Sequence, residues 1–235
     1  MLIRALDAST SVVTVAVAHA GPGESGLRAG REVLAEISVP SRGASEALLP
    51  AAHAALSLAG TKLSEVERVL AGLGPGTFTG IRIALATARA LALATGADLS
   101  KNTTLAALAA PASLSMERPD VLAVLDARRR QVFAQRFAGD GARGEVLCAT
   151  PEEIFTGIPA ENAALVVGDG AVRYREALSF LGRIPPDGSP LHRVTAAGHV
   201  LSADLTPVSP EEVVPLYVRE PDAEARRDLN PWSKA

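Results

Sequence analysis

The beginning of the chain alternates apolar and β-branched runs with short polar turns. Residues 2–9 and 12–19 form two such runs, separated by a Ser/Thr turn, and a third run at 32–40 follows a Gly-rich connection at 21–30. Short runs bounded by turn residues are typical of β-strands. The pattern therefore predicts a meander of three strands.

The spacing of apolar residues then changes to that of a helix. Between residues 45 and 60 the chain carries a predicted N-cap at Ser45 and a predicted stop at Gly60, while Pro50 is able to shift or kink the first turn. A short buried strand is predicted at 68–74. The apolar positions at helical spacing are Leu48, Leu49, Ala52 and Leu56.

Helix and strand patterns continue to alternate to the end of the chain. A long helix is predicted across 81–95, apolar segments return at 105–113, 121–137 and 165–171, and a closing helix is predicted near 195–204. Such alternation indicates an α/β fold.

Two segments half a chain apart resemble each other. Asp7 and Asp126 each end an apolar run, and each is followed by a polar turn and a second run. The few shared letters are equally compatible with two unrelated hairpins. The matched order of the elements that follow favours an internal duplication.

The Gly-rich loop at 72–80 leads into the long apolar helix. It lacks the G-K-[ST] ending of a P-loop, the G-x-G-x-x-G fingerprint and the G-x-S-x-G nucleophile turn. With Thr77 or Thr79 as N-cap, the helix start is a general anion site. The alternative, which this evidence favours, is that the glycines only let strand and helix pack closely.

The helix after this loop is apolar on almost every side. Between residues 81 and 95 its only charged residues are Arg82 and Arg89, and a helix that is apolar all round must be buried all round. Together with the helix at 45–60 it forms a candidate docking surface for a partner. The alternative is that the two helices only cover each other and the sheet.

Composition narrows the functional classes. The chain has 235 residues, a net charge of −3, one cysteine and four histidines that never fall at a metal-ligand spacing, so neither an internal disulfide nor a metal site is expected. The chain has one run of basic residues, at 128–130, and this run does not indicate a protein that binds nucleic acid by itself. We also expect a cytoplasmic protein, because no leader is visible and Arg82 and Arg89 interrupt the longest apolar run.

Five segments, in order and spacing, resemble the bacterial TsaB (YeaZ) proteins, which help to make threonylcarbamoyladenosine in tRNA. The specific one is G-P-G-[ST]-F-T-G-[IL]-R at 74–82, and the D-A-R turn at 126–128 and P-x-Y-x-R at 215–219 support it. The resemblance implies an actin-like ATPase fold of two ribonuclease H-like halves. It places the halves at 1–103 and 104–218, followed by a polar tail.

The resemblance also implies a vestigial nucleotide cleft, with at most weak binding of ATP or ADP and no other cofactor. Asp7 is expected to face the space between the two halves. The residues at the positions of the phosphate and adenosine motifs are Asp7, Ser9, Thr10, Gly74, Gly76, Thr77, Thr79, Asp126, Gly168 and Gly170.

One departure from the family's catalytic relative bears on mechanism. TsaD holds a metal through H-x-x-x-H on a helix, whereas the corresponding helix here has His53 alone. The resemblance therefore implies a non-catalytic partner of TsaD that acts with the ATPase TsaE, pairs with itself when alone, reaches tRNA only through the complex and contacts no membrane. The expected partner interface comprises Leu48, Leu49, Ala52, Leu56, Arg82, Leu85 and Arg89.

Two other classes stay open. One is an independent enzyme, either an ATPase or sugar kinase of this fold or a peptidase, although no Ser/His/Asp set or metal site can be assembled from the sequence. The other is a purely structural homodimer.

Overall fold

The computed structural model describes residues 1–21, 30–40, 43–114, 120–138, 141–154 and 164–219. Of the expected polar tail, residues 219–235, only Arg219 lies within the described residues. The first sheet has the order β3(Arg31–Pro40), β2(Val12–Ala20), β1(Leu2–Asp7), β4(Arg68–Gly72), β5(Asp98–Asn102), and the second has the order β8(Gly141–Ala149), β7(Gln131–Ala138), β6(Val121–Arg128), β9(Leu165–Val167).

The two sheets repeat one topology. In each, a central strand pairs antiparallel with the next strand of the chain and parallel with a later one: β1 with β2 and β4, and β6 with β7 and β9. Asp7 ends β1, and Asp126 lies near the end of β6. This repetition agrees with the duplication inferred from the sequence.

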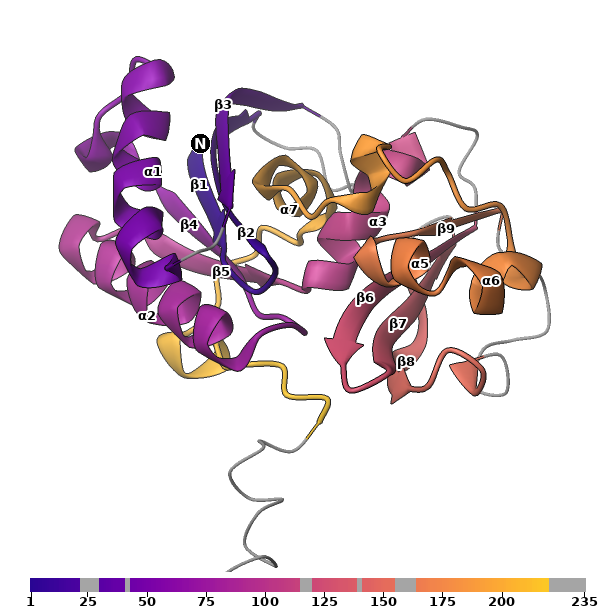
Figure 1. Ribbon diagram of the computed structural model, residues 1–235. Coiled ribbons are helices and arrows are strands. Elements are labelled where there is room, and N and C mark those ends of the chain that lie inside the picture. The colour runs from indigo at the N-terminus through magenta and orange to yellow at the C-terminus, as the bar shows by residue number, and fades with distance from the viewer. Residues whose placement is uncertain (22–29, 41–42, 115–119, 139–140, 155–163, 220–235) are drawn as a thin grey trace, which may run out of the picture.

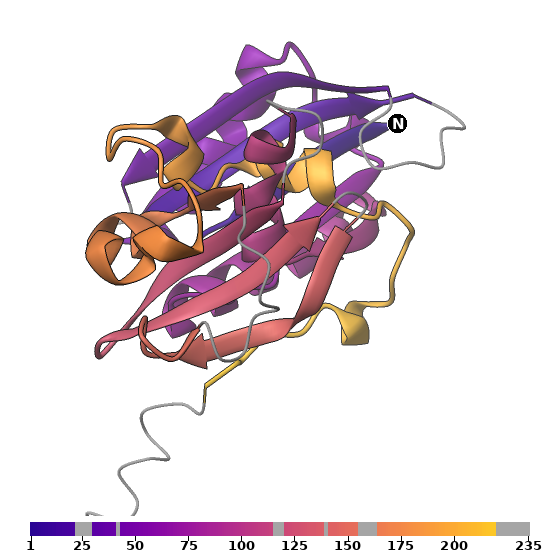
Figure 2. The same cartoon turned by 90° about the vertical axis from the view of Figure 1, so that its right-hand side faces the viewer.

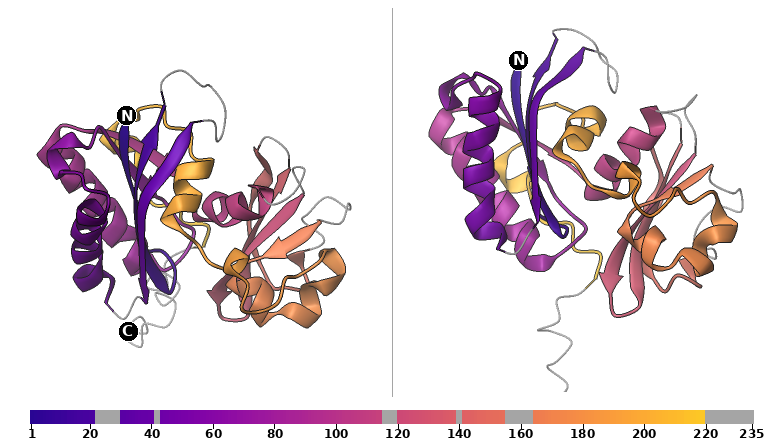
Figure 3. Two further views of the ribbon diagram at one scale, coloured as in Figure 1. Left: turned by 90° about the horizontal axis from the view of Figure 1, so that it is seen from above. Right: turned by 45° about the horizontal axis from the view of Figure 1, so that its top comes forward.

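Helices lie on both sides of each sheet (Figures 1 and 3). One face of the first sheet is covered by α1(Ala44–Leu58) and α2(Phe78–Thr95). Between the sheets lie α7(Ala196–Ser202), packed on the first sheet, and α3(Thr104–Leu114), packed on the second. The outer face of the second sheet packs against α5(Asp169–Arg173) and α6(Arg175–Leu178).

We call the first sheet with α1, α2 and α7 the N-terminal lobe, and the second sheet with α3, α5 and α6 the C-terminal lobe. The closing helix α7 thus returns to the first sheet, where Thr14 Oγ1 accepts a hydrogen bond of 2.9 Å from the backbone N–H of Ala196. The two lobes are seen from the side in Figure 2.

Most of the expected elements are present, with differences at their ends. The helix expected from Ser45 begins at Ala44 with Gly43 as N-cap, so Ser45 is not the cap. Gly60 does end it, in a left-handed conformation with φ of 65°. Two polar edge strands, β5 and β8, were not predicted because neither carries an alternating apolar pattern.

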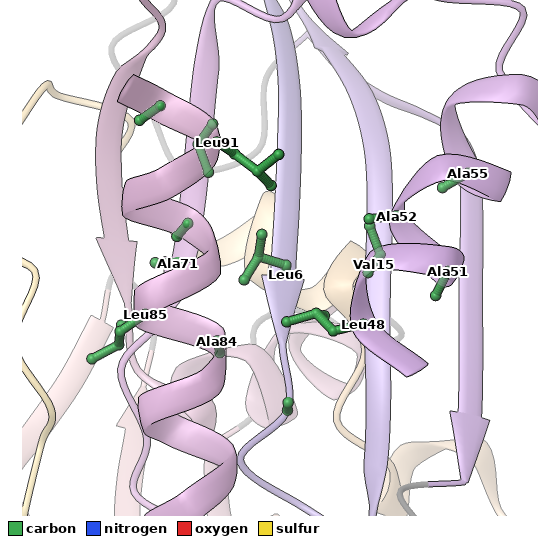
Figure 4. Packing of buried hydrophobic residues seen from close by; sticks show 14 of the residues in the cluster. Leu6, Val15, Leu48, Ala51, Ala52, Ala55, Ala71, Ala84, Leu85 and Leu91 are labelled. Atoms are coloured by element: carbon green, nitrogen blue, oxygen red, sulfur yellow. The ribbon is translucent and has the colours of Figure 1, made fainter. Parts of the chain in front are cut away.

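The hydrophobic core beneath α1 and α2 consists of leucines packed against smaller apolar residues. Figure 4 shows Leu6 of β1 between the two helices, with Leu48 of α1 and Leu91 of α2 extending toward β1. Most of the other buried helical positions of this layer are alanines, beside Leu56, Ile81 and Leu91, and these alanines let both helices approach the sheet closely.

The length and hydropathy of α2 would suffice to span a membrane, so the two arginines do not disqualify it as the sequence suggested. Its Ile81, Ala84, Leu85, Ala88 and Leu91 are buried in the core beneath it. Packing on a sheet therefore accounts for one side of its apolar surface.

Candidate functional site

The carboxylate of Asp7 is held entirely by its own chain. Its Oδ1 accepts a 2.6 Å hydrogen bond from the backbone N–H of Ser9. Its Oδ2 accepts from Thr104 Oγ1 at 3.0 Å and from His199 Nε2 at 2.8 Å. Both Asp7 and His199 are fully buried, so residues from β1, α3 and α7 meet at one charge between the lobes.

The environment of Asp7 favours its ionised form. Burial by itself would raise the pKa of this carboxyl, but the hydrogen bond and charge of His199, together with the bonds from Ser9, hold the pKa below its usual value. Nδ1 of His199 is buried without a hydrogen-bond partner, so the ring is bonded through Nε2 alone.

The backbone of the Gly-rich loop also packs closely against Asp7 and Ser9. A Cβ on Gly72 would lie 2.2 Å from Asp7 Oδ2, and one on Gly76 would lie 2.1 Å from the carbonyl oxygen of Ser9. That same carbonyl accepts the backbone N–H of Thr77 at 2.6 Å. The glycines of the loop thus permit close packing of the β1 turn against the start of α2, which is the structural alternative that the sequence favoured.

A cavity of about 430 Å³ lies at the junction of the lobes. Its walls are the turn after β1, the start of α2, the end of β6, Asp169 and a C-terminal segment. Of the predicted cleft residues, the cavity lining includes Ser9, Thr10, Gly76, Thr77 and Asp126. The others do not line it. The carboxylate of Asp7 lies between the lobes, but it is enclosed by Ser9, Thr104 and His199.

The acidic groups of the C-terminal lobe are partnered as well. Asp126 Oδ2 forms ion pairs with Arg128 at 3.3 Å and Arg173 at 3.2 Å. Asp169 Oδ1 accepts the backbone N–H of Asp126 at 3.0 Å. Burial, with a contribution from the nearby charge of Asp126, raises the pKa of Asp169. Gly168 and Gly170 lie beside Asp169, with Gly168 as the N-cap of α5.

Residues 213–219, which we call the strap, join the two lobes along the cavity (Figure 1, yellow). The backbone N–H of Leu216 donates to the carbonyl of Leu73 at 2.9 Å, and Arg219 donates to the carbonyl of Ala127 at 3.0 Å. The ring of Tyr217 stacks on Phe78 with centroids 5.2 Å apart. The strap therefore fills one side of the cavity and contacts both lobes.

The predicted partner interface needs correction. Leu48, Ala52, Leu56 and Leu85 are buried inside the chain because they face the sheet. Only Leu49 of the predicted apolar set is exposed, at 55%.

The two arginines of the set are bound by the strap. Arg82 lies over the ring of Phe78 and donates to the hydroxyl of Tyr217 at 2.8 Å, and Arg89 donates to the carbonyl of Val213 at 2.9 Å.

A different set of residues forms the outer face of the helical layer. On α2 the side chains of Ala86, Ala90, Leu93 and Ala94 are exposed, and Leu93 is 88% exposed. With Leu49 of α1 these residues, which we call the outer helical face, are uncharged and mostly small. An exposed apolar patch of this kind is a candidate surface for packing against another protein.

Several residues that organise the site were missed by sequence reasoning. Thr104 and His199 meet Asp7 from distant parts of the chain, and nothing local in the sequence indicates this. The P-x-Y-x-R segment was noted but not placed at the cavity. Among the residues that the structure describes, no group of three or more His, Cys, Asp or Glu is arranged to hold a metal ion.

The arrangement of the two sheets and their helices first identifies the fold class. The activator component A of (R)-2-hydroxyglutaryl-CoA dehydratase from Acidaminococcus fermentans matches 91% of this chain with a TM-score of 0.50 at 12% identity, which shows the shared fold alone. This is the actin-like ATPase fold, as expected from the sequence.

Two comparisons identify the family. The family model described as TsaD, tRNA N6-adenosine threonylcarbamoyltransferase, matches residues 37–183. YeaZ from Pseudomonas aeruginosa superposes with a TM-score of 0.71 at 26% identity, over 92% of this chain and 99% of its own. The chain belongs to the TsaB/YeaZ proteins of tRNA threonylcarbamoyladenosine biosynthesis.

Sequence relatives agree with this assignment. The TsaB protein of Escherichia coli is 30% identical over 140 residues, covering 60% of this chain and 56% of its own length. An uncharacterized protein of Mycobacterium tuberculosis, Rv3421c, is 32% identical over 94% of this chain and 93% of its own length.

Proposed function

We propose that this chain is a non-catalytic subunit that docks on TsaD. It supports the transfer of a threonylcarbamoyl group to the adenosine next to the anticodon in tRNAs that decode ANN codons, with TsaE as the ATPase of the system. Its relatives TsaB of Escherichia coli and a tRNA N6-adenosine threonylcarbamoyltransferase of Methylocapsa acidiphila, which is 28% identical, support membership in this system.

The observation that carries the proposal is the outer helical face. It exposes Leu93, Ala90 and Leu49 on the same helices through which the family resemblance places TsaD, and the exposed Arg82 and Arg89 of α2 are bonded to the strap. In the absence of TsaD, the same face is expected to pair two copies of this chain about a two-fold axis.

The junction cavity supports a non-catalytic role. Asp7 uses both carboxyl oxygens on its own chain, and Asp126 is paired with Arg128 and Arg173. These carboxylates do not fit a magnesium nucleotide as they stand, so we expect no cofactor and at most weak binding of ATP or ADP. We further propose that the protein works in the cytoplasm and meets tRNA only through the complex.

Reconstitution of tRNA modification tests the proposal. TsaD and TsaE of the same organism, unmodified tRNA and the threonylcarbamoyl-adenylate donor are combined with and without this chain, and the nucleosides are measured by mass spectrometry. The modified nucleoside is expected only when TsaD and this chain are both present. Modification by this chain without TsaD, or full modification without this chain, would refute the proposal.

A further inference from the structure

One buried charge in the N-terminal lobe has no partner among the described residues. Arg4, in the middle of β1, is 2% exposed, and its Nε is buried without a hydrogen-bond partner. The described residues also offer its side chain no ion pair. Desolvation lowers the pKa of this guanidinium to about 10, so it is still charged at neutral pH.

Other arginines buried in strands are paired within the chain. Arg68 of β4, 7% exposed, pairs with Asp98 at 3.2 Å and donates to Ser100 Oγ. Arg136 of β7, 4% exposed, pairs with Asp120. A buried arginine in this fold is thus normally supplied with an aspartate, and Arg4 is the exception among these three.

The direction of the Arg4 side chain follows from the alternation of β1. Leu2 and Leu6 belong to the cluster with α1 and α2, whereas Ile3 and Ala5 belong to the cluster with α7. Arg4 therefore points toward α1 and α2, on the same side as Leu6, which Figure 4 shows between the two helices.

The helices above Arg4 carry small side chains there. Ala52 and Ala55 of α1 and Ala84 and Ala88 of α2 are all buried in this layer. Leu56 and Leu91 complete the layer into which the Arg4 side chain extends from β1.

We propose that Arg4 receives a carboxylate from the protein that docks on the outer helical face. An aspartate or glutamate of the partner reaches between α1 and α2 and pairs with the guanidinium, which is suited to planar, two-pronged binding of carboxylates. This inference rests on the proposed function and adds the chemistry by which the partner is recognised.

Charge argues that this partner is a different protein rather than a second copy. Along α1 and α2 the sole acidic residue is Glu46, in the first turn of α1, where its carboxylate lies against Gly43. A second copy paired through this face would therefore offer Arg4 no carboxylate other than Glu46. A partner with carboxylates in excess fits better.

The test is calorimetric titration of TsaD from the same organism into wild-type chain, Arg4→Met and Arg4→Lys. Arg4→Met removes the charge at similar volume, and we expect it to weaken binding about tenfold or more, with Arg4→Lys in between. The free Arg4→Met protein should melt at a higher temperature than wild type, because an unpaired buried charge has been removed. Loss of binding then cannot be attributed to unfolding.

The outcomes separate this inference from the proposed function. If wild-type chain fails to bind TsaD, the proposed function fails. If wild type binds, Ala90→Arg on the outer helical face abolishes binding and Arg4→Met binds normally, only the role of Arg4 is refuted. A lower melting temperature for free Arg4→Met would show that Arg4 is already satisfied within the chain, which also overturns the inference.

A double-mutant cycle would identify the group on the partner. Acidic residues on the docking helices of TsaD are changed singly to the matching amide and titrated against wild type and Arg4→Met. One amide variant should weaken binding to wild type and cause no further loss with Arg4→Met. Equal losses for both backgrounds at every acidic position would contradict a pairing with Arg4.

Discussion

On the face of the first sheet that packs against α7, the buried charge of Asp7 meets Ser9, Thr104 and His199. On the opposite face, beneath α1 and α2, the buried charge of Arg4 meets no partner among the described residues. The two residues are three positions apart on one strand. The charge of Asp7, on the α7 side that we call the inner face, is therefore satisfied within the chain. We interpret the layer beneath α1 and α2, which we call the outer layer, as one half of an interface with another protein.

The difference separates the two buried charges by their surroundings. On the α7 side of the sheet, every hydrogen bond to Asp7 comes from groups of the chain itself. At the outer layer, exposed Ala90 and Leu93 lie on a helix whose other side is fully packed.

Removing the carboxylate of Asp7 should have the largest effect on stability. Asp7→Ala removes the partner of buried His199 and is expected to lower the free energy of unfolding by about 3–5 kcal/mol. Asp187→Ala is the matched control, because its exposed ion pair with Arg175 should contribute about 1 kcal/mol or less. Urea denaturation measures both, and equal losses would contradict the assignment of Asp7 as a structural anchor.

The two sides of α2 can be compared with one substitution. Leu85→Ala, on the buried side, should cost about 2–5 kcal/mol of unfolding free energy because it leaves a cavity. Leu93→Ala, on the exposed side, should change stability by no more than about 0.5 kcal/mol. If Leu93→Ala is as destabilising as Leu85→Ala in the free chain, the outer helical face is not exposed.

The strap should contribute less than either core change. Tyr217→Ala removes the stack on Phe78 and the hydrogen bond from Arg82, and is expected to cost about 1 kcal/mol. Tyr217→Phe keeps the stack and should cost less. Thermal unfolding of the two variants measures the difference, and identical losses would assign the whole effect to the hydroxyl.

Lowering the pH should gradually reduce the contribution of Asp7 to the free energy of unfolding. Because the pKa of Asp7 is lower in the folded chain than its ordinary 3.8, its contribution is fully present above about pH 4 to 5 and is lost as the pH falls through the folded-state pKa. The stability difference between wild type and Asp7→Ala should therefore shrink on acidification below pH 4. A difference that stays constant down to pH 2 would show that the charge of Asp7 contributes nothing.

The sequence was informative where local pattern decides structure. The alternation in residues 2–9 and 12–19 predicted β1 and β2, and the echo of Asp7 and Asp126 predicted the second sheet. It could not place His199 beside Asp7, because that contact joins residues nearly a full chain apart.

The site was predicted less well than the fold. Leu48 and Leu85 were assigned to a partner interface because apolar spacing alone does not say which side of a helix meets the sheet. The charge of Arg4 within an otherwise buried strand was visible in the sequence. Its significance depends on the lack of a nearby carboxylate, which a single sequence does not reveal.

Binding of TsaD to the outer helical face tests the account most directly. Calorimetric titration compares wild-type chain with Ala90→Arg, and with Phe180→Arg as a control that places the same charge at an exposed site on the C-terminal lobe. We predict that Ala90→Arg binds TsaD at least about tenfold more weakly, a loss of about 1.4 kcal/mol or more, while Phe180→Arg binds as wild type does. Undiminished binding by a folded Ala90→Arg protein would contradict the account.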